Sequence, residues 1–467
     1  MQPVRPWTRI TNVPIPGRVC GMQPVRDNAQ RKWLVVGSNT GVWLVRSGDP
    51  VDITPTGFAA GYETTELGGG FGAGDYDREM YGTPRTQETG ITLEADTWHF
   101  DVWGEFIVGC SVGDGTAYVW RPGTLSTPYD ATMLPISNAP ANNRGLLTTN
   151  ERHLMLISAG GDPRKVQWSA REDYTVWAPT ALNLAGDLTL ETAGSLQTGL
   201  KAPNGIVVLS EVDAFLIRYV GQPFGYGQDR IGHNCGIIGP HAGASTSDFV
   251  VWMGITGFWS YRGQLQSIPC DVWDFVFRDL NLRQTSQISC GHNADFHELW
   301  WFFPKGDATK NSHYVSWNYR ENWWATGELA RTHWQEKGAW TASVAAGADG
   351  FLYEHEKPFT SPGAAMRPAP YITSAPFMLG SGENIMHVTH ITPDQECKSL
   401  DALSYTFATR FTPACGDKEF GPYYPDADGY TDTRFAGREI EWTVRAEKDI
   451  SWRMGILHAE IAPGGRR

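Results

Sequence analysis

The chain has 467 residues and is rich in residues that favour short strands and tight turns, with 20 Trp, 52 Gly and 29 Pro. A chain of this length has room for two or three domains. Its formal net charge of −13 argues against a protein that grips nucleic acid, because phosphates are held by clustered Lys and Arg.

The start of the chain predicts neither export nor membrane insertion. Residues 1–17 lack an uninterrupted apolar segment, so we expect no secretory signal and synthesis in the cytoplasm. The strongest apolar run, residues 249–259, is too short and too often broken by glycine to span a membrane.

Because the cysteines are odd in number and form no CxxC pair, we expect mostly reduced thiols and no zinc site. They are Cys20, Cys110, Cys235, Cys270, Cys290, Cys397 and Cys415.

One turn pattern recurs along the chain: a short turn that ends in Gly, followed by alternating apolar and aromatic residues. Glycine tolerates the positive φ of such turns, and the alternation buries one face of the strand that follows. The clearest copies are SNTGVWLV (38–45), VGDGTAYVW (112–120), GITGFWSY (254–261) and GADGFLYE (347–354). Looser copies lie around Gly161, Asp213 and Gly306.

The spacing of these turns predicts the fold. From Gly115 to Gly350, successive turns lie 44 to 52 residues apart, which is the period of four-stranded propeller blades. We therefore predict an all-β chain in which residues 1–361 form a β-propeller of about seven blades, with six or eight as alternatives. The interval from Gly41 to Gly115 is 74 residues, and a polar, Gly-rich insertion at 58–90 accounts for the excess. This insertion is a candidate for a loop that reaches into a channel or onto a neighbouring subunit, and the alternative is a plain surface loop.

The segment VQWSAREDYTVW (166–177) has the residue types of a catalytic site but the pattern of a strand and its turn. Val166 and Trp168 fall on one face of the predicted strand, and Trp177 is expected to pack onto a neighbouring sheet. Asp173 is placed to cap the turn by accepting backbone N–H bonds. The segment loosely resembles the Asp-box turn of sialidase-type propellers but lacks the glycine of that turn, so we predict a structural role.

A Pro- and Gly-containing stretch at 355–371 ends the repeats, and we place a domain boundary near Ser361. Beyond it, alternation of apolar and polar residues predicts two half-buried strands joined by a turn at 447–449. The apolar face of the first strand is Ile440, Trp442, Val444 and Ala446. The partner face is Ile450, Trp452, Met454 and Ile456. Residues 362–467 are therefore expected to form a small β-sandwich-like domain.

Two short motifs have the letters of enzyme signatures without their context. Residues 109–113 spell G-x-S-x-G around Ser111, but a nucleophile elbow leads into a helix, whereas residues 114–120 read as another strand. The segment GYGQDRIG (225–232) has the wrong glycine spacing for a dinucleotide site. Paired carboxylates for glycoside hydrolysis stay open, because 51 Asp and Glu offer many pairs whose separation is a three-dimensional property.

Metal ligation is not favoured either. Two histidine pairs lack further ligands at a usable spacing, and a group of aspartates around a glycine turn lacks the closing bidentate Glu of a calcium loop. The histidines are His292 with His297 and His387 with His390, and the aspartates are Asp426, Asp428 and Asp432. We predict a plain turn at 426–432, with calcium as the alternative. The sequence thus predicts no catalytic, cofactor-binding or metal-binding residues and no cofactor.

Several segments resemble virion structural proteins of tailed bacteriophages. The Gly- and Tyr-rich insertion is followed by a strand of the form W-x-x-D-x-W-G-E, and the chain ends in a W-x-x-G strand with a Gly-Arg tail, DISWRMGILHAEIAPGGRR. The residues that carry the resemblance are Trp98, Asp101, Trp103, Gly104, Glu105, Tyr118 and Trp120. The pattern is most similar to the tail-nozzle branch of short-tailed phages, also called packaged-DNA stabilisation proteins.

This resemblance implies a non-enzymatic virion protein of the phage tail. Six copies of a propeller would form a closed ring around the DNA exit channel, retain the packaged DNA and let it pass on infection. The implied partners are further copies of the chain, a tail adaptor, tail fibre or spike proteins, and double-stranded DNA in transient, non-specific passage, without membrane insertion. Two rivals stay open: a propeller enzyme that acts on glycans, and a monomeric propeller that serves as a protein-binding platform.

Overall fold

A computed structural model of the chain describes residues 7–46, 48–67, 92–124, 126–180, 183–356, 371–397, 399–412, 416–429, 431–448 and 452–465. These residues form two compact units. The larger unit is Arg9–Glu354, and the smaller unit consists of the described residues from His355 onward together with those before Arg9. The predicted boundary at Ser361 lies outside the described residues, as does most of the insertion at 58–90.

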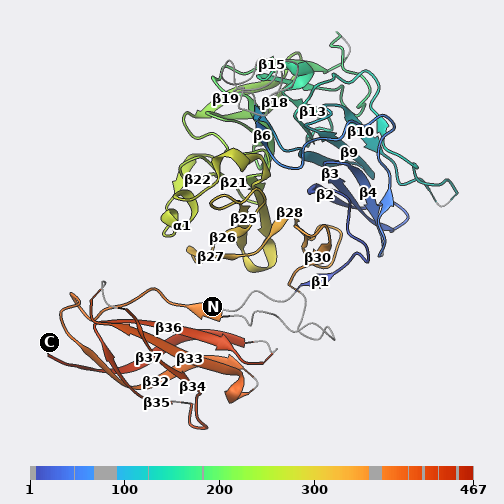
Figure 1. The fold of residues 1–467 in the computed structure, drawn as a ribbon. Helices are drawn as coiled ribbons and strands as arrows, with labels where there is room; N and C mark the ends of the chain where they lie inside the picture. Colours follow the sequence, from blue (N-terminus) through green and yellow to red (C-terminus); the bar gives the residue numbers. More distant parts are fainter. Residues whose placement is uncertain are drawn as a thin grey trace, which may run out of the picture. The chain divides into compact units, whose positions relative to one another are not determined.

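Seven four-stranded antiparallel sheets make up the larger unit, and they follow one another around a centre that we call the hub (Figure 1). Blade 1 contains β2 (Val19–Arg26), β3 (Lys32–Ser38), β4 (Gly41–Val45) and β5 (Val51–Asp52). Blade 2 contains β8 (Trp98–Trp103), β9 (Phe106–Ser111), β10 (Ala117–Trp120) and β11 (Leu134–Pro135). Blade 3 contains β12 (Gly145–Thr148), β13 (Leu154–Ile157), β14 (Lys165–Trp168) and β15 (Gly186–Thr189). Blades 4 and 5 are β16 (Leu196–Ala202), β17 (Gly205–Ser210), β18 (Ala214–Gly221) and β19 (Gly225–Gly232); β20 (Gly243–Ser245), β21 (Val250–Met253), β22 (Phe258–Tyr261) and β23 (Leu265–Ile268). Blades 6 and 7 are β24 (Ser289–Asn293), β25 (Glu298–Phe303), β26 (His313–Asn318) and β27 (Trp323–Glu328); β28 (Arg331–Gln335), β29 (Val344–Gly347), β30 (Leu352–Glu354) and β1 (Thr8–Arg9).

The ring of blades is closed. The first strand of each blade contacts the first strand of the next, and β28 contacts β2. Blade 7 takes its outer strand from the other end of the chain, because β1 pairs with β30 and the Ile10 N–H donates to the Leu352 carbonyl at 2.8 Å. The predicted all-β fold with a propeller of about seven blades is confirmed.

The seven turns found in the sequence occupy one equivalent position, because each joins the second strand of its blade to the third. Four of their glycines have positive φ, namely Gly115, Gly161, Gly306 and Gly350. Gly41 and Gly257 do not. At Gly41 a close approach replaces the dihedral requirement, since a Cβ would lie 2.3 Å from the Thr54 hydroxyl oxygen, whereas a Cβ at Gly257 would meet open space.

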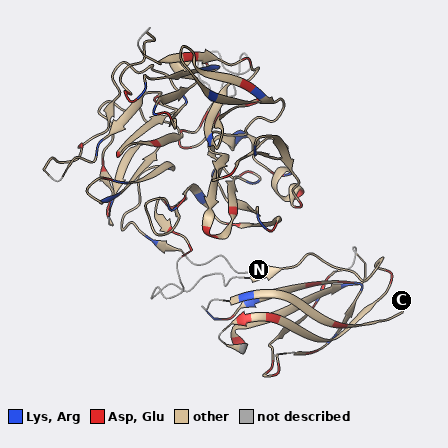
Figure 2. Cartoon of the chain, turned by 180° about the vertical axis from the view of Figure 1, so that it is seen from behind, with Lys and Arg blue, Asp and Glu red and all other residues tan. Residues whose placement is uncertain are grey.

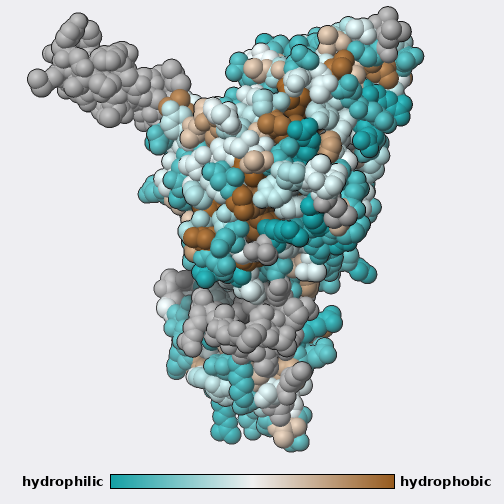
Figure 3. All heavy atoms as spheres, turned by 90° about the vertical axis from the view of Figure 1, so that its right-hand side faces the viewer, coloured by the Kyte–Doolittle hydropathy of each residue, from teal (hydrophilic) through white to brown (hydrophobic). Residues whose placement is uncertain are grey.

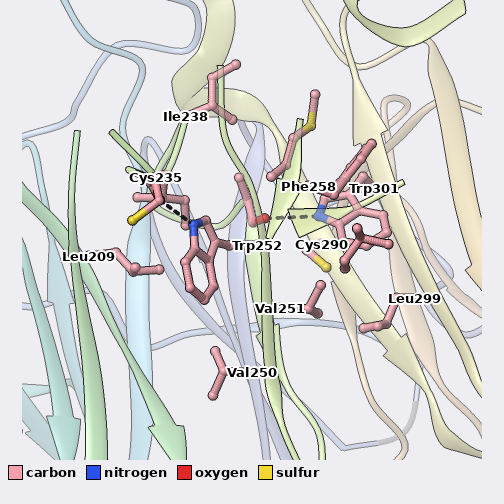
Figure 4. Close-up of a cluster of buried hydrophobic side chains, with 14 of the residues drawn as sticks. Leu209, Cys235, Ile238, Val250, Val251, Trp252, Phe258, Cys290, Leu299 and Trp301 are labelled. Atoms are coloured by element: carbon pink, nitrogen blue, oxygen red, sulfur yellow. Dashed lines mark hydrogen bonds between the residues drawn. The ribbon is translucent and has the colours of Figure 1, made fainter. Parts of the chain in front are cut away.

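Hydrophobic clusters fill the spaces between adjacent blades, and buried tryptophans tie the blades together. Trp98 of blade 2 donates its indole N–H to the Ser38 carbonyl of blade 1 at 3.0 Å, and Trp334 of blade 7 donates to the His292 carbonyl of blade 6 at 3.3 Å. In the cluster shared by blades 4 to 6, Trp252 donates to the Cys235 carbonyl at 2.7 Å and Trp301 donates to the Ala242 carbonyl (Figure 4). Each indole thus fills a gap between blades and also satisfies a buried carbonyl.

The smaller unit is a sandwich of two antiparallel sheets around one hydrophobic core. One sheet contains β31 (Tyr371–Thr373), β36 (Glu439–Ala446), β33 (Leu403–Arg410) and β34 (Lys418–Tyr423). The other contains β35 (Thr431–Gly437), β32 (Met386–Cys397) and β37 (Trp452–Pro463).

One predicted core residue of this sandwich is wrong. Trp452 and Met454 are buried, but Ile456 is 67% exposed. The reason is a bulge, in which Gly455 and Ile456 together oppose Asp394 of β32, so the inward face of β37 moves to odd-numbered residues such as Leu457. The predicted core residue Ile450 lies outside the described residues.

Short elements complete the described chain. They are a two-stranded ribbon, β6 (Glu66–Leu67) with β7 (Thr92–Leu93), the helix α1 (Trp273–Phe277), and the 3₁₀ turns Ala159–Gly161, Leu282–Gln287, Ala294–Phe296 and Leu400–Ala402. No helix in the described ranges has the length and apolar character needed to cross a membrane. The six cysteines that the structure describes carry free thiols, and Cys415 lies outside them.

Removal of a buried indole tests the blade core. Trp252→Ala should lower the free energy of unfolding by about 3–5 kcal/mol, because it leaves a cavity and strips the Cys235 carbonyl of its donor. The matched control is Trp273→Ala, because the Trp273 side chain is 43% exposed and its removal should cost less. Urea denaturation followed by near-UV circular dichroism measures both, and equal losses in the two variants would contradict the assignment.

A pair of turn glycines gives a second test. Gly115→Ala should cost more than about 2 kcal/mol, because Gly115 has φ +70° and its Cβ would lie 2.6 Å from the Asn142 Cα. Gly257→Ala at the equivalent turn of blade 5 should change stability by less than about 0.5 kcal/mol, since that Cβ meets open space. Thermal unfolding of the two variants compares these costs directly.

Candidate functional site

Three histidines from different blades meet at the hub. His99 is on β8 of blade 2, His241 precedes β20 of blade 5, and His333 is on β28 of blade 7. The rings of His99 and His241 stack at 4.6 Å between centroids, and those of His241 and His333 meet edge to face at 5.0 Å. His241 Nε2 also lies 3.0 Å from the carbonyl oxygen of Trp98, which belongs to blade 2 as His99 does. At this level side chains fill the centre of the propeller.

These imidazoles are uncharged at neutral pH. Burial lowers the pKa of His241 to about 4; the Trp98 carbonyl opposes this shift and Arg18 adds to it. Burial also holds the pKa of His99 and of His333 well below the ordinary value, with smaller contributions from His241 and from the nearby guanidinium groups. His99 Nε2 and His333 Nδ1 have no hydrogen-bond partner among the described atoms.

The described part of the insertion forms a stem that crosses from blades 1 and 2 to the segment between blades 5 and 6. We call residues 61–67 and 92–96 the stem; its strands β6 and β7 pair with each other. Gln284 holds the stem as a neighbouring strand would, because its amide accepts from Thr65 N–H at 2.9 Å and donates to the Thr65 carbonyl at 2.8 Å. Lys310 also pairs with Glu63 at 2.5 Å. The stem therefore joins residues 61–67 of the insertion to residues 92–96, which follow it, and residues 68–90 of the insertion lie outside the described residues.

At its other side the stem is bound to the hub through two arginines. The buried Arg18 guanidinium donates to the carbonyl of Glu63 at 2.8 Å and to the carbonyl of Asp96. Arg144 pairs with the Glu94 carboxylate and donates to Gln197 Oε1 at 3.0 Å. Arg18 and Arg144 also adjoin the hub histidines. Gly145, next to Arg144, packs against the His99 ring, where an added Cβ would lie 3.2 Å from the ring. The Asp96 carbonyl that Arg18 holds is two residues from the Trp98 carbonyl that His241 contacts, and both guanidinium groups contribute to the lowered pKa values of the rings.

A cavity of about 880 Å³ opens beside the stem, between it and the loops of blades 4 to 6. Its lining mixes polar and apolar side chains and carries more negative than positive charge. Its charged residues are Glu66, Glu94, Glu211, Asp307 and Arg283. Two of the carboxylates have partners, since Glu94 pairs with Arg144 and Glu211 accepts from the Ser195 hydroxyl at 3.0 Å. Among the described residues that line it, none has an aromatic ring on which a sugar would stack.

The residues of the W-x-x-D-x-W-G-E strand hold blade 2 to its neighbours. Asp101 accepts from the Thr148 N–H of blade 3 at 2.7 Å and pairs with Lys201 of blade 4 at 2.6 Å. Glu105 accepts from the Asn28 N–H of blade 1 at 3.0 Å. The motif carboxylates therefore act as structural ties between blades.

The other residues of that pattern are structural as well. Trp98 packs on Phe100 at 5.1 Å, Trp103 packs edge to face on Tyr174, and Trp120 donates to the Asp130 carbonyl. Gly104 supplies the positive φ of the β8–β9 turn, and Tyr118 donates to Asp114.

Ser111 of the G-x-S-x-G motif ends strand β9, and the chain continues into β10 rather than into a helix. Its hydroxyl lies 2.8 Å from both carboxylate oxygens of the buried Asp96. Burial raises the pKa of Asp96, while N–H and O–H donors from Gly113, Ser111 and Thr97 oppose the shift. Ser111 thus stabilises a buried carboxyl group at the foot of the stem.

The predicted histidine pairs are differently placed. His292 and His297 share Tyr319, whose hydroxyl lies 3.2 and 3.3 Å from their ring nitrogens. His390 lies between the carboxylates of Asp432 and Glu460 on neighbouring strands, at 2.8 and 3.1 Å.

His387 is exposed on the same strand. Within the described ranges, no three His, Cys, Asp or Glu side chains are grouped so as to hold a metal ion.

Both predicted aspartate turns have the geometry of structural turns. In 166–177, Asp173 accepts from the Thr175 N–H at 2.8 Å, and Trp177 is buried between blades 2 and 3, as predicted. In 426–432, Asp426 accepts from the Asp428 N–H at 3.1 Å around a positive-φ Gly429.

One carboxyl pair bears on the glycan alternative. Burial raises the pKa of Glu298 to about 7, the Trp300 N–H opposes this, and Glu321 adds to it. Trp300 donates to Glu298 and Trp323 donates to Glu321, each at 3.0 Å. Neither carboxylate lines the described cavity.

The hub histidines and the arginine contacts of the stem are not among the residues predicted from the sequence. The signal in the sequence is weak, because each histidine stands in or just before the first strand of a blade, with no motif around it. Their proximity depends on closure of the whole ring.

The sequence matches no protein-family model and no curated protein. Among solved structures, the chain is similar to the Pan2 WD40 domain of Neurospora crassa, with 9% identity, 77% of this chain and 97% of that chain covered, and a TM-score of 0.42. It is also similar to BBS1N, solved in complex with ARL6DN, with 10% identity, 76% and 98% coverage and a TM-score of 0.29. A third similar structure is the extracellular domain of the putative hybrid two component system BT4673 from B. thetaiotaomicron, with 10% identity, 83% and 57% coverage and a TM-score of 0.32.

The neutral hub predicts a loss of stability in acid. The unfolded chain protonates its histidines near their ordinary pKa of 6.5, whereas folded His241 resists protonation until about 4. The stability that the neutral ring confers is therefore complete above the higher pKa and lost as the pH falls toward the lower one. His241→Gln should recover about 3 kcal/mol of this loss, because an amide still donates to the Trp98 carbonyl but does not titrate.

Urea denaturation at a series of pH values measures this effect. His458→Gln, at an exposed site in the smaller unit, serves as the control and should follow the unmodified chain. Parallel profiles for the two variants would contradict the assignment.

Proposed function

We propose that the protein is a structural component of a phage tail, and that copies of it assemble as a ring around the path of the DNA. The observation that carries this proposal is the use made of the motif residues that resemble phage virion proteins. Asp101 and Glu105 bind blade 2 to blades 1, 3 and 4, so these two motif residues have a structural role rather than a catalytic one.

Two further properties support a ring. Because His99, His241 and His333 fill the hub, a path for duplex DNA would lie between copies and not through one propeller. Acidic and basic residues are interspersed along the described chain (Figure 2), and the sequence is acidic as a whole. A wall of this kind offers phosphates few counterion-releasing contacts and lets DNA slide.

Contact surfaces for such an assembly are available. Small apolar areas interrupt the hydrophilic surface (Figure 3). The most exposed large apolar side chain that the structure describes is Phe224, at 75%, on the β18–β19 hairpin tip beside the exposed Val220. Burial of such side chains against another copy would favour association.

The proposal is tested by assembly and by location. Sedimentation velocity and negative-stain imaging of the purified chain should reveal a ring of six copies. Immunogold labelling of phage particles whose genome encodes the chain should place the label at the tail, which also covers a ring that forms only on the growing particle. Label on the capsid, or absence of the protein from particles, would contradict the proposal.

A propeller enzyme that acts on glycans is the second candidate, favoured by the raised pKa of Glu298 beside Glu321. It predicts that the purified chain cleaves oligosaccharides and that Glu298→Gln abolishes the cleavage. Cleavage that depends on Glu298 would contradict the proposed structural role and support the enzyme in its place.

A further inference from the structure

The hub histidines and the stem share their cations. Arg18 holds the stem through the carbonyl oxygens of Glu63 and Asp96, and Arg144 holds it through the carboxylate of Glu94. The neutral rings tolerate these guanidinium groups because an imidazole without charge does not repel them. A proton on any of the three rings would place a second positive charge in the same buried space.

We propose that His99, His241 and His333 form an acid-sensitive latch, in which protonation of the hub repels Arg18 and Arg144 and releases the stem while the blades remain folded.

The groups that face the latch support this sequence of events. The charged side chains around the rings are Arg18 and Arg144, and their counter-charges, Asp96 and Glu94, belong to the stem. The nearby thiols of Cys20 and Cys290 are neutral, because burial raises the pKa of both. Among the described residues no carboxylate contacts a hub ring, so an added proton is compensated only when the arginines or the rings move.

Opening of the stem requires less free energy than displacement of a blade. Its described bonds to the body are hydrogen bonds and ion pairs, and among the described side chains no residue of 61–67 or 92–96 belongs to a hydrophobic cluster. These bonds are those from Arg18 and Arg144, the Gln284 pairing, the Thr65–Ser286 contact at 3.0 Å, the Glu63–Lys310 pair, the Gly61–Asn39 bonds, and the bonds of Ser111 and Gly113 to the Asp96 carboxylate. Each blade, by contrast, packs through a hydrophobic cluster against its neighbours. Local opening therefore requires less free energy than loss of a blade.

Hydrogen exchange resolved by mass spectrometry tests the latch, with each rate divided by that of an unstructured peptide at the same pH. Between about pH 7 and about pH 4, where folded His241 takes up its proton, protection in residues 61–67 and 92–96 should fall at least about tenfold more than in Val250–Met253 of blade 5. Equal losses in the stem and the blade, or no loss in the stem, would overturn the proposal.

Variants provide the second arm. The triple variant His99→Gln, His241→Gln, His333→Gln should lose the extra fall in the stem, and His458→Gln should retain it. If the triple variant does not fold, His241→Gln replaces it, because it removes the ring with the pKa of about 4 and should lose most of the extra fall. A stem that still opens selectively in acid in the hub variant would also overturn the latch. This inference does not depend on the proposed role in a phage tail, because the exchange experiment uses the isolated chain.

Discussion

The fold depends on buried indoles that bridge adjacent blades. A four-stranded sheet cannot bury both of its faces by itself, so a blade is stable only when wide side chains fill the wedge on either side. Tryptophan supplies the volume, and its N–H meets a carbonyl of the neighbouring blade, as Trp98 does at Ser38 and Trp334 does at His292. An aliphatic residue would fill the wedge but leave that carbonyl unpaired.

Local chemistry made most of the propeller predictable. A turn and the strand after it are set by a few consecutive residues, and repetition multiplies a weak signal, which is why seven turns predicted seven blades. The same reasoning failed at Ile456, because strict alternation takes no account of a bulge, and the bulge depends on Asp394 in a strand about sixty residues earlier. The positive φ expected at Gly41 and Gly257 failed likewise, since the path of those turns is set by the whole hairpin.

The hub could not be predicted for a related reason. His99, His241 and His333 come from blades 2, 5 and 7, and nothing near any one of them in the sequence refers to the others. The stem is similar: Gln284 imitates a strand partner for Thr65 across more than two hundred residues. Composition indicated that the insertion was not part of the core. The residues that the stem contacts are brought together only when the ring of blades closes.

The closure of blade 7 by β1 has a consequence for synthesis. The segment around Ile10 is synthesised before any of the blades, yet its partner Leu352 follows more than three hundred residues later. Until then, six sheets can form in order behind one another, but the ring stays open and the first segment has no edge to join. The slowest contact to form is thus the one that joins the two ends of the propeller. A nascent chain interrupted before blade 7 would expose the flanks of its first and last finished blades, which makes the late part of translation the stage at which this protein most needs protection from aggregation.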